Sequence, residues 1–105
     1  MSEYLLGYAL NNDLSAVRDC IEKYGINVNV QDEKGRTALH IACSKGNLPS
    51  INYVIIDLII VIEYLLSKGA NYNLPDCMNN TPLHVSVITG NSESVALIIQ
   101  ASRSI

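Results

Sequence analysis

Three cysteines and two histidines are the side chains of this 105-residue chain with the most chemistry to offer. Cys20, Cys43 and Cys77 stand 23 and 34 residues apart, which matches neither a disulfide framework nor the spacing of a zinc site. Unpaired thiols favour a reducing compartment, and the first residues, MSEYLLGYALNND, lack the basic start and apolar run of a signal peptide. We therefore expect an intracellular protein, cytoplasmic or nuclear, without a bound metal.

Other reactive or ligand-binding motifs are missing from the sequence. The segment KGNLPS lacks the spacing and the Lys-Ser/Thr pair of a phosphate-binding loop, and no Ser or Cys has a base placed by a recognisable motif. Seven basic and ten acidic residues give a net charge of −3, and the basic residues form no cluster that would suit nucleic acid. The sequence predicts no enzyme, no catalytic residue, no cofactor and no nucleic-acid partner.

The two histidines belong to an internal repeat. The segments NVNVQDEKGRTALHIACSKGN (27–47) and NYNLPDCMNNTPLHVSVITGN (71–91) align without gaps, which places His40 opposite His84. A weaker third copy begins the chain, where NNDLSAV (11–17) aligns with KGNLPSI (45–51). A chain of this length and self-similarity predicts one domain built from a stack of similar units.

The matched residue types predict a helix in each copy. Thr37 and Thr81 can cap a helix by accepting hydrogen bonds from its first free N–H groups, and Pro82 suits the first helical position. Leu39 and Leu83 are expected to point inward. Gly46 and Gly90 can take the left-handed conformation that ends a helix, and Gly69 does the same for a second helix.

A tight turn precedes each of these helices. The segments Asp32 to Gly35 and Asp76 to Asn79 have turn-forming aspartates at the start, which we interpret as turn formers rather than acid–base residues. Asn79 stands where the first copy has Gly35. Because Asn tolerates positive φ better than most residues, we expect it to take over the role of that glycine.

The motifs TALHIA and TPLHVS, with GANYN before the second, resemble the ankyrin repeat signature Thr-Pro-Leu-His-x-Ala. The resemblance covers most of the chain and implies an all-α solenoid of helix-turn-helix pairs with hairpin finger loops. Repeats would run over about 3–30, 31–74 and 75–105. It further implies that His40 and His84 hydrogen-bond across neighbouring turns.

The stretch SINYVIIDLIIVIEYLL (50–66) does not fit the ordinary repeat. The family spacing between the two helix-ending glycines is about 12 residues, whereas Gly46 and Gly69 stand 23 apart, so an insertion of 11 residues falls at about 51–61. Eleven residues make about three helical turns, which would lengthen the second helix by about 16 Å and keep its inner face in register. Asn52, Asp57 and Glu63 interrupt the run, which argues against a membrane span.

Two alternatives to a lengthened helix stay open. The segment YVIIDLIIVI is rich in β-branched residues and could form a strand, and the insertion could also be an artefact of a gene model. If the helix is lengthened, its neighbours would not cover it. We then expect an exposed apolar surface for self-association, in a homodimer or by helix exchange. Its residues would be Ile55, Ile56, Leu58, Ile59, Ile60 and Val61.

The ankyrin resemblance implies a protein-binding module acting as a small inhibitor or scaffold. By position, the finger tips would present Glu33, Lys34, Arg36, Cys77, Met78 and Asn80. The concave surface of the first helices would present Ile41, Ser44, Lys45, Val85, Ile88 and Thr89. Self-association through the insertion is the alternative function, and the partner is expected to be another protein in either case.

Overall fold

The computed structural model describes the backbone of residues 2–44 and 52–103, and the side chains of 4–44 and 59–103. Within these ranges the chain forms helices and no strand, so the predicted all-α fold is confirmed. The helices are α1 (Ser2–Leu10), α2 (Leu14–Arg18), η1 (Asp19–Lys23), α3 (Ala38–Cys43), α4 (Asn52–Ser67), α5 (Pro82–Ile88) and α6 (Ser92–Arg103).

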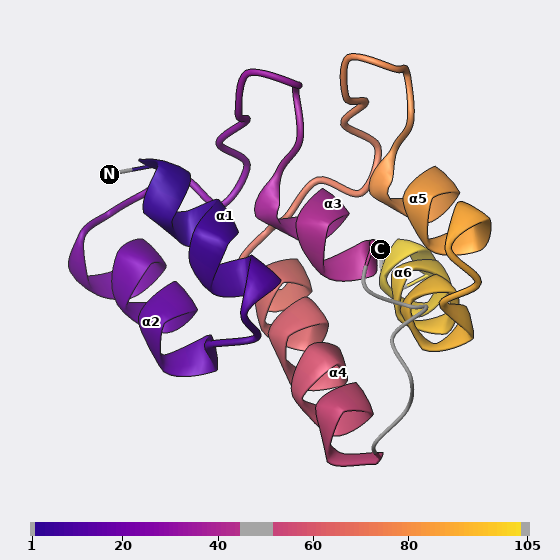
Figure 1. Cartoon of the computed structure of the whole chain (residues 1–105), viewed down its shortest axis with the longest axis horizontal. Coiled ribbons are helices and arrows are strands. Elements are labelled where there is room, and N and C mark those ends of the chain that lie inside the picture. The colour runs from indigo at the N-terminus through magenta and orange to yellow at the C-terminus, as the bar shows by residue number, and fades with distance from the viewer. Residues whose placement is uncertain (1, 45–51, 104–105) are drawn as a thin grey trace.

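The helices form two rows. Helices α1, α3 and α5 lie side by side in one row, and α2, α4 and α6 lie in the other, with contacts between successive members of each row. Two hairpin loops project from the same side of the molecule, one before α3 and one before α5 (Figure 1). We call residues 31–36 finger one and residues 75–80 finger two.

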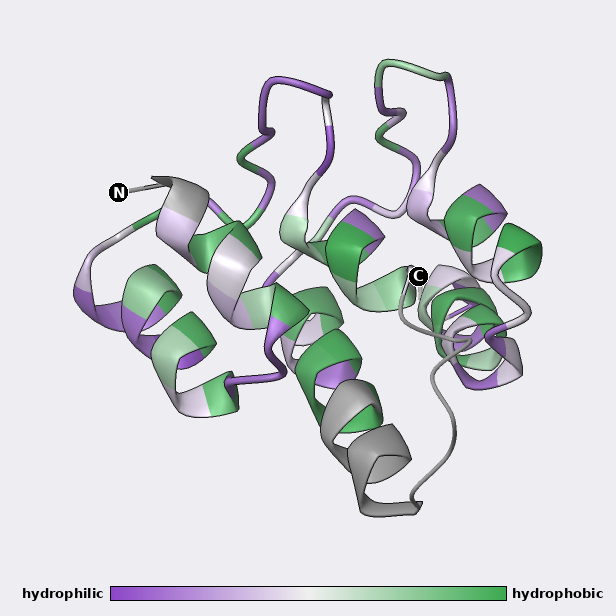
Figure 2. Ribbon diagram, in the orientation of Figure 1, coloured by the Kyte–Doolittle hydropathy of each residue, from purple (hydrophilic) through white to green (hydrophobic). Residues whose placement is uncertain are grey.

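The core runs through all three helix pairs. Leu5, Leu39, Ile62, Leu65 and Ile98 are almost completely buried, and each such side chain contributes about 1.5–3 kcal/mol of burial free energy. Apolar residues concentrate on the helices, while most of finger one is hydrophilic (Figure 2). The helices therefore supply the apolar contacts that hold the stack together, and the finger positions can carry side chains that do not serve the core.

The stretch that contains the insertion is helical. The strand alternative is wrong, because α4 runs without a break from Asn52 to Ser67. It has 16 residues against 12 in α6, so the described helix is longer by four residues, or about one turn, where three extra turns were expected. Residues 52–61 of the predicted insertion lie within α4, and residue 51 is outside the described residues.

A hydrogen-bonded tyrosine joins α4 to the first repeat. The Tyr64 hydroxyl donates to the Glu22 carboxylate, and the guanidinium of Arg18 lies 5.7 Å from the centre of the tyrosine ring. Burial, followed by the bond to Glu22, raises the pKa of Tyr64 to about 12. The phenol therefore stays protonated and keeps its donor role at physiological pH.

The first repeat uses different residues for the same local structure. Asn12 has a φ of 56°, and Gly90 has a φ of 74° at the corresponding place in the third repeat. Gly25 follows Asn12 by 13 residues, one more than the usual spacing of about 12, and η1 is π-helical. A π turn takes up one extra residue, so η1 restores the register of this helix.

Candidate partner-binding surface

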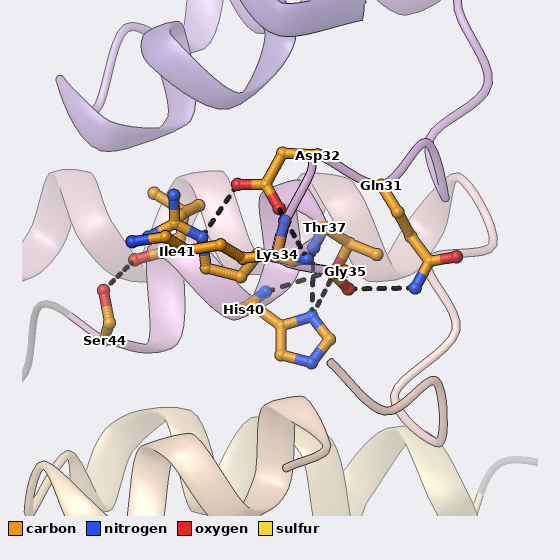
Figure 3. A network of polar contacts seen from close by, with 9 residues as sticks. Gln31, Asp32, Lys34, Gly35, Thr37, His40, Ile41 and Ser44 are labelled. Carbon is orange, nitrogen blue, oxygen red and sulfur yellow. Dashed lines mark hydrogen bonds and ion pairs between the residues drawn. The ribbon is translucent and has the colours of Figure 1, made fainter. Parts of the chain in front are cut away.

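The Asp32 carboxylate organises finger one (Figure 3). Its Oδ1 accepts hydrogen bonds from the backbone N–H groups of Lys34 at 2.9 Å and Arg36 at 2.8 Å. Its Oδ2 accepts another from the guanidinium Nε of Arg36, also at 2.8 Å. The Gly35 N–H donates to the Asp32 carbonyl at 3.0 Å and closes the turn, so Asp32 is a turn former, as predicted.

These contacts fix the charge state of Asp32. Burial alone would raise the pKa of its carboxyl, but hydrogen bonds from Arg36 and Lys34 and the charge of Arg36 outweigh burial and lower the pKa below its usual value. The carboxylate is therefore ionised at neutral pH, and the Arg36 guanidinium forms an ion pair with it. Within finger one, Glu33 and Lys34 are the charged side chains that point into solvent without an ion pair among the described residues.

Finger two repeats this architecture. The Asp76 Oδ1 accepts hydrogen bonds from the N–H groups of Met78 at 2.9 Å and Asn80 at 3.0 Å. Asn79 has a φ of 64°, close to the 75° of Gly35, so the prediction that Asn79 takes the glycine's role is confirmed. The two fingers thus have the same backbone path.

The fingers pair with each other through their backbones. The Cys77 N–H of finger two donates to the Lys34 carbonyl of finger one at 2.8 Å. The Gln31 side chain adds a bridge, donating from Nε2 to the Gly35 carbonyl at 2.9 Å and to the Pro75 carbonyl at 3.4 Å. A Cβ at Gly35 would lie 2.9 Å from the Cys77 nitrogen, so this close pairing requires glycine there.

The threonine caps and histidines connect the fingers to the helices. The Thr37 N–H donates to His40 Nδ1 at 3.1 Å, which makes Nδ1 the acceptor and leaves the proton on Nε2. That Nε2 then donates to the Asn80 carbonyl at 2.8 Å, across the repeat boundary. The predicted inter-repeat hydrogen bond is confirmed for His40.

The second histidine makes the same local cap without the bridge. Nδ1 of His84 accepts from the Thr81 N–H at 3.2 Å, with Pro82 at the first helical position. His84 is exposed, and within the described part of the chain its Nε2 meets no hydrogen-bond partner. The bridging role that the resemblance implied for His84 is therefore not seen, because no further finger follows α5 in this part of the chain.

The predicted binding residues differ in how much of each is exposed to solvent. The exposed ones are Glu33, Lys34, Ser44, Cys77, Met78 and Ile88. Half-buried positions are Arg36, Asn80, Val85 and Thr89. Ile41 is only 8% exposed and belongs to the core beside α1, so its predicted place on the binding surface is wrong. Lys45 lies outside the described residues, as does Gly46.

Two of the half-buried residues have structural hydrogen bonds. The Asn80 carbonyl accepts from His40 Nε2. The Thr89 hydroxyl lies 3.0 Å from the Cys43 carbonyl and 2.9 Å from the Val85 carbonyl, so it joins α5 to α3. These two residues hold adjacent repeats together, and the exposed tips are better placed to contact a partner.

Sequence reasoning missed a pocket beside finger one. It measures about 610 Å³ and is lined by Leu6 of α1, by Val30 and by residues 31–34 and 36. Leu6 was not singled out, because its distance in sequence from the finger hides their proximity. The apolar Val30 directly before the polar run of finger one was the signal that could have pointed to it.

The structure describes the side chains of three of the six residues predicted for self-association. Ile55, Ile56 and Leu58 lie outside the described side chains. Ile59 is half-buried and Ile60 is 40% exposed. Val61 is fully buried, so its predicted exposure is wrong. With Ile62 and Leu65 it faces the core, since the three positions share one side of the helix.

Cys20 and Cys43 are buried thiols, whereas Cys77 is exposed. Burial raises the pKa of the Cys43 thiol to about 12, with the nearby Ser94 hydroxyl acting in the opposite direction. Burial, and then the charge of Asp19, also raise the pKa of Cys20.

Among residues 4–44 and 59–103, no three His, Cys, Asp or Glu side chains gather as metal ligands would. None of the described helices combines the length and apolar character needed to cross a membrane.

Repeated helix pairs, paired fingers and a histidine bridge between repeats define a class of proteins, the helical repeat solenoids. A model of the ankyrin repeat family, with three copies of the repeat, matches residues 5–105, so the chain belongs to that family. A dog protein (Canis lupus familiaris), the uveal autoantigen with coiled-coil domains and ankyrin repeats, is 38% identical over 52 residues. That match covers 50% of this chain but 4% of the dog protein. Ankyrin repeats are, as a family, non-enzymatic modules of protein–protein interaction.

Proposed function

We propose that this protein binds a partner protein through the tips of its two fingers and the exposed ends of α3 and α5. The observation that carries the proposal is the finger pair, whose backbone hydrogen bond from Cys77 to Lys34 orders the backbone that carries the exposed charged and apolar side chains. Met78 is 77% exposed at the tip of finger two. A backbone that is ordered before binding loses less conformational entropy than that of a flexible loop.

The chemistry of this surface suits a mixed interface. Glu33 and Lys34 offer one charge of each sign, Met78 offers an adaptable apolar contact, and Ile88 is 70% exposed at the end of α5. Interface cores are depleted in charge and surrounded by a polar rim. We therefore place Met78 and Ile88 at the centre of the contact and the finger-one charges at its rim. A chain with this one surface would act as a small inhibitor or scaffold.

The test compares two variants in partner capture followed by calorimetry with the purified partner. One variant changes the tips, Glu33→Ala, Lys34→Ala and Met78→Ala together. The control, Glu93→Ala with Arg103→Ala, changes exposed residues of α6 on another part of the molecule. The tip variant should lose at least tenfold in affinity, and the control should match the parent chain. Equal affinity for the tip variant and the parent would rule the proposal out.

A second candidate function is self-association through α4. Its first turns extend past the other helices in Figure 1, and Ile60 is 40% exposed. Light scattering over a concentration series would test this for the chain, for a variant without residues 51–61 and for Ile60→Lys. A dimer that both changes convert to a monomer supports self-association. A mass that does not change with concentration in the parent chain excludes it.

A further inference from the structure

The pairing of the two fingers shows how a finger accepts a neighbour. Finger two uses one backbone donor, the Cys77 N–H, and finger one supplies the Lys34 carbonyl at 2.8 Å. The donor belongs to the second residue of its turn. The two turns have matching internal hydrogen bonds. The backbone N–H of the second turn residue of finger one should therefore have the same orientation relative to its own repeat.

The corresponding donor of finger one is the Glu33 N–H, because Cys77 and Glu33 are 44 residues apart in the repeat alignment. Each neighbouring N–H in the turn has an acceptor: that of Asp32 donates to the Arg36 carbonyl, and those of Lys34 and Arg36 donate to the Asp32 carboxylate. Among the described residues, the Glu33 N–H has no acceptor. By analogy with Cys77, it points away from finger two.

The pocket of about 610 Å³ lies on that same side of finger one. Leu6 of the first repeat contributes to its wall, whereas the opposite side of finger one is occupied by Cys77 and Asp76. Leu6 and Val30 provide apolar surface, and Asp32 and Arg36 neutralise each other at 2.8 Å. The pocket thus combines an unused backbone donor with apolar surface from Leu6 and Val30, beside the charged side chains of Glu33 and Lys34.

We infer that this open edge of finger one docks an extended peptide segment of a partner protein. One carbonyl of that segment accepts from the Glu33 N–H, as the Lys34 carbonyl accepts from Cys77. A neighbouring apolar side chain of the segment packs on Leu6 and Val30. Extended chains present a carbonyl and an adjacent side chain at this short spacing, which is how strand-addition partners gain both affinity and specificity.

This inference deepens the proposed function and rests on it for the nature of the partner, but it places contact at the side of finger one rather than at the tips. The closing experiment can therefore separate the two. Its key variant is Glu33→Pro, which removes the N–H. The turn reads Asp-Glu-Lys-Gly, and proline is favoured at the second position of such a turn, so the finger should keep its shape.

The probe is a phage-displayed library of random heptapeptides selected on the full chain, with one selected peptide measured by fluorescence polarisation. Glu33→Ala keeps the N–H and should bind within about threefold of the parent. Glu33→Pro should weaken binding by about tenfold, which is the loss of about 1.4 kcal/mol expected for one backbone hydrogen bond. Val30→Thr keeps the shape of the side chain, replaces one methyl group by a hydroxyl and should weaken binding severalfold. Thermal unfolding checks that each variant is folded.

Three outcomes overturn the inference: no heptapeptide is selected, Glu33→Pro binds as the parent does, or the Glu33 amide resonance of the parent chain does not shift on peptide titration. If a protein partner depends on Lys34 and Met78 but not on the Glu33 N–H, the tip-binding function stands and the edge site does not. If the edge site binds peptides while tip changes have no effect on a partner, the reverse holds.

Discussion

His40 and His84 show how position in the stack changes the work of one residue type. Both rings accept a hydrogen bond from the threonine N–H at the start of their helix, at 3.1 and 3.2 Å. Among the residues that the structure describes, His40 alone of the two then has a carbonyl in reach of Nε2, that of Asn80 at 2.8 Å, and the residue is 2% exposed. Both copies of the motif form the helix cap, whereas the bridge forms where the finger of another repeat lies beside the histidine.

Alanine at these two positions should therefore have unequal effects. We expect His40→Ala to lower the free energy of unfolding by about 2–3 kcal/mol, because it removes a buried side chain and the bridge, and leaves the partly buried Asn80 carbonyl without its donor. His84→Ala should cost about 1 kcal/mol or less, the value of a helix cap at an exposed site. Urea denaturation followed by circular dichroism measures both, and equal losses would contradict the bridging role.

The Asp32 carboxylate predicts a pH dependence of stability. Its folded pKa lies below its unfolded value of about 3.9, so ionised Asp32 stabilises the fold above about pH 4 and the contribution is lost as the pH falls through the folded pKa. Asp32→Asn should cost about 1 kcal/mol at pH 7, where it removes the ion pair with Arg36. The difference from the parent should shrink near pH 3. Urea titrations at both pH values test this, and a constant difference would contradict it.

At the scale of elements, the spacing between fingers decides which residues a turn can hold. Gly35 and Asn79 have nearly the same φ, 75° and 64°, so left-handed backbone alone does not require glycine. The difference lies in the neighbour: a Cβ at Gly35 would lie 3.1 Å from Asp76 Cα as well as 2.9 Å from the Cys77 nitrogen. Asn79 has a Cβ because no described element packs on that side of finger two.

Exchanging these two residues should have opposite effects. Gly35→Asn should destabilise the chain by about 2–3 kcal/mol, because the backbone of finger two must move and the Cys77 hydrogen bond weakens. Asn79→Gly should change stability by less than about 1 kcal/mol, since it removes a Cβ that meets no neighbouring finger. Thermal unfolding of both variants gives the comparison. Similar losses would mean that backbone strain, and not finger packing, selects glycine at position 35.

The sequence predicted local structure best where a residue type has a single role in the backbone around it. Thr37 as a cap, Asp32 as a turn former and Asn79 as a substitute for glycine each follow from chemistry within four residues of the chain. The burial of Ile41 and Val61 did not follow, because it depends on which helix lies alongside. The pocket beside Val30 was also missed, since Leu6 reaches it only after the first repeat has folded.

The length of α4 shows the same limit. Helical periodicity predicted correctly that the apolar stretch forms a helix from Asn52 onward, and Ile62 and Leu65 of its predicted inner face are fully buried. It did not predict that the described α4 exceeds α6 by four residues rather than by eleven. That difference in length depends on how far the neighbouring helices extend, which a single apolar pattern does not encode. The five-residue π-helix η1, which takes up one extra residue, was missed for a similar reason.

Across the whole molecule, burial is highest in the middle repeat. Cys43 and Val87 occupy corresponding positions, yet Cys43 is fully buried and Val87 is 62% exposed. The middle repeat has a neighbour on each side, whereas each end repeat has one within the described chain. In stacked repeats, stability is approximately a sum of repeat and nearest-neighbour terms, so the end repeats should open more readily than the middle one.

The three cysteines make this gradient measurable, because one lies in each repeat. Cys77 is exposed and should react with a thiol reagent within the mixing time, while Cys20 and Cys43 are 3% and 0% exposed and should react only after opening. Since Cys20 belongs to the first repeat, it should be labelled by local opening before Cys43, whose labelling should follow global unfolding. Mass spectrometry of labelled peptides over time, at increasing urea, would give the three rates. Identical rates for Cys20 and Cys43 at every urea concentration would instead show that the three repeats unfold as one unit.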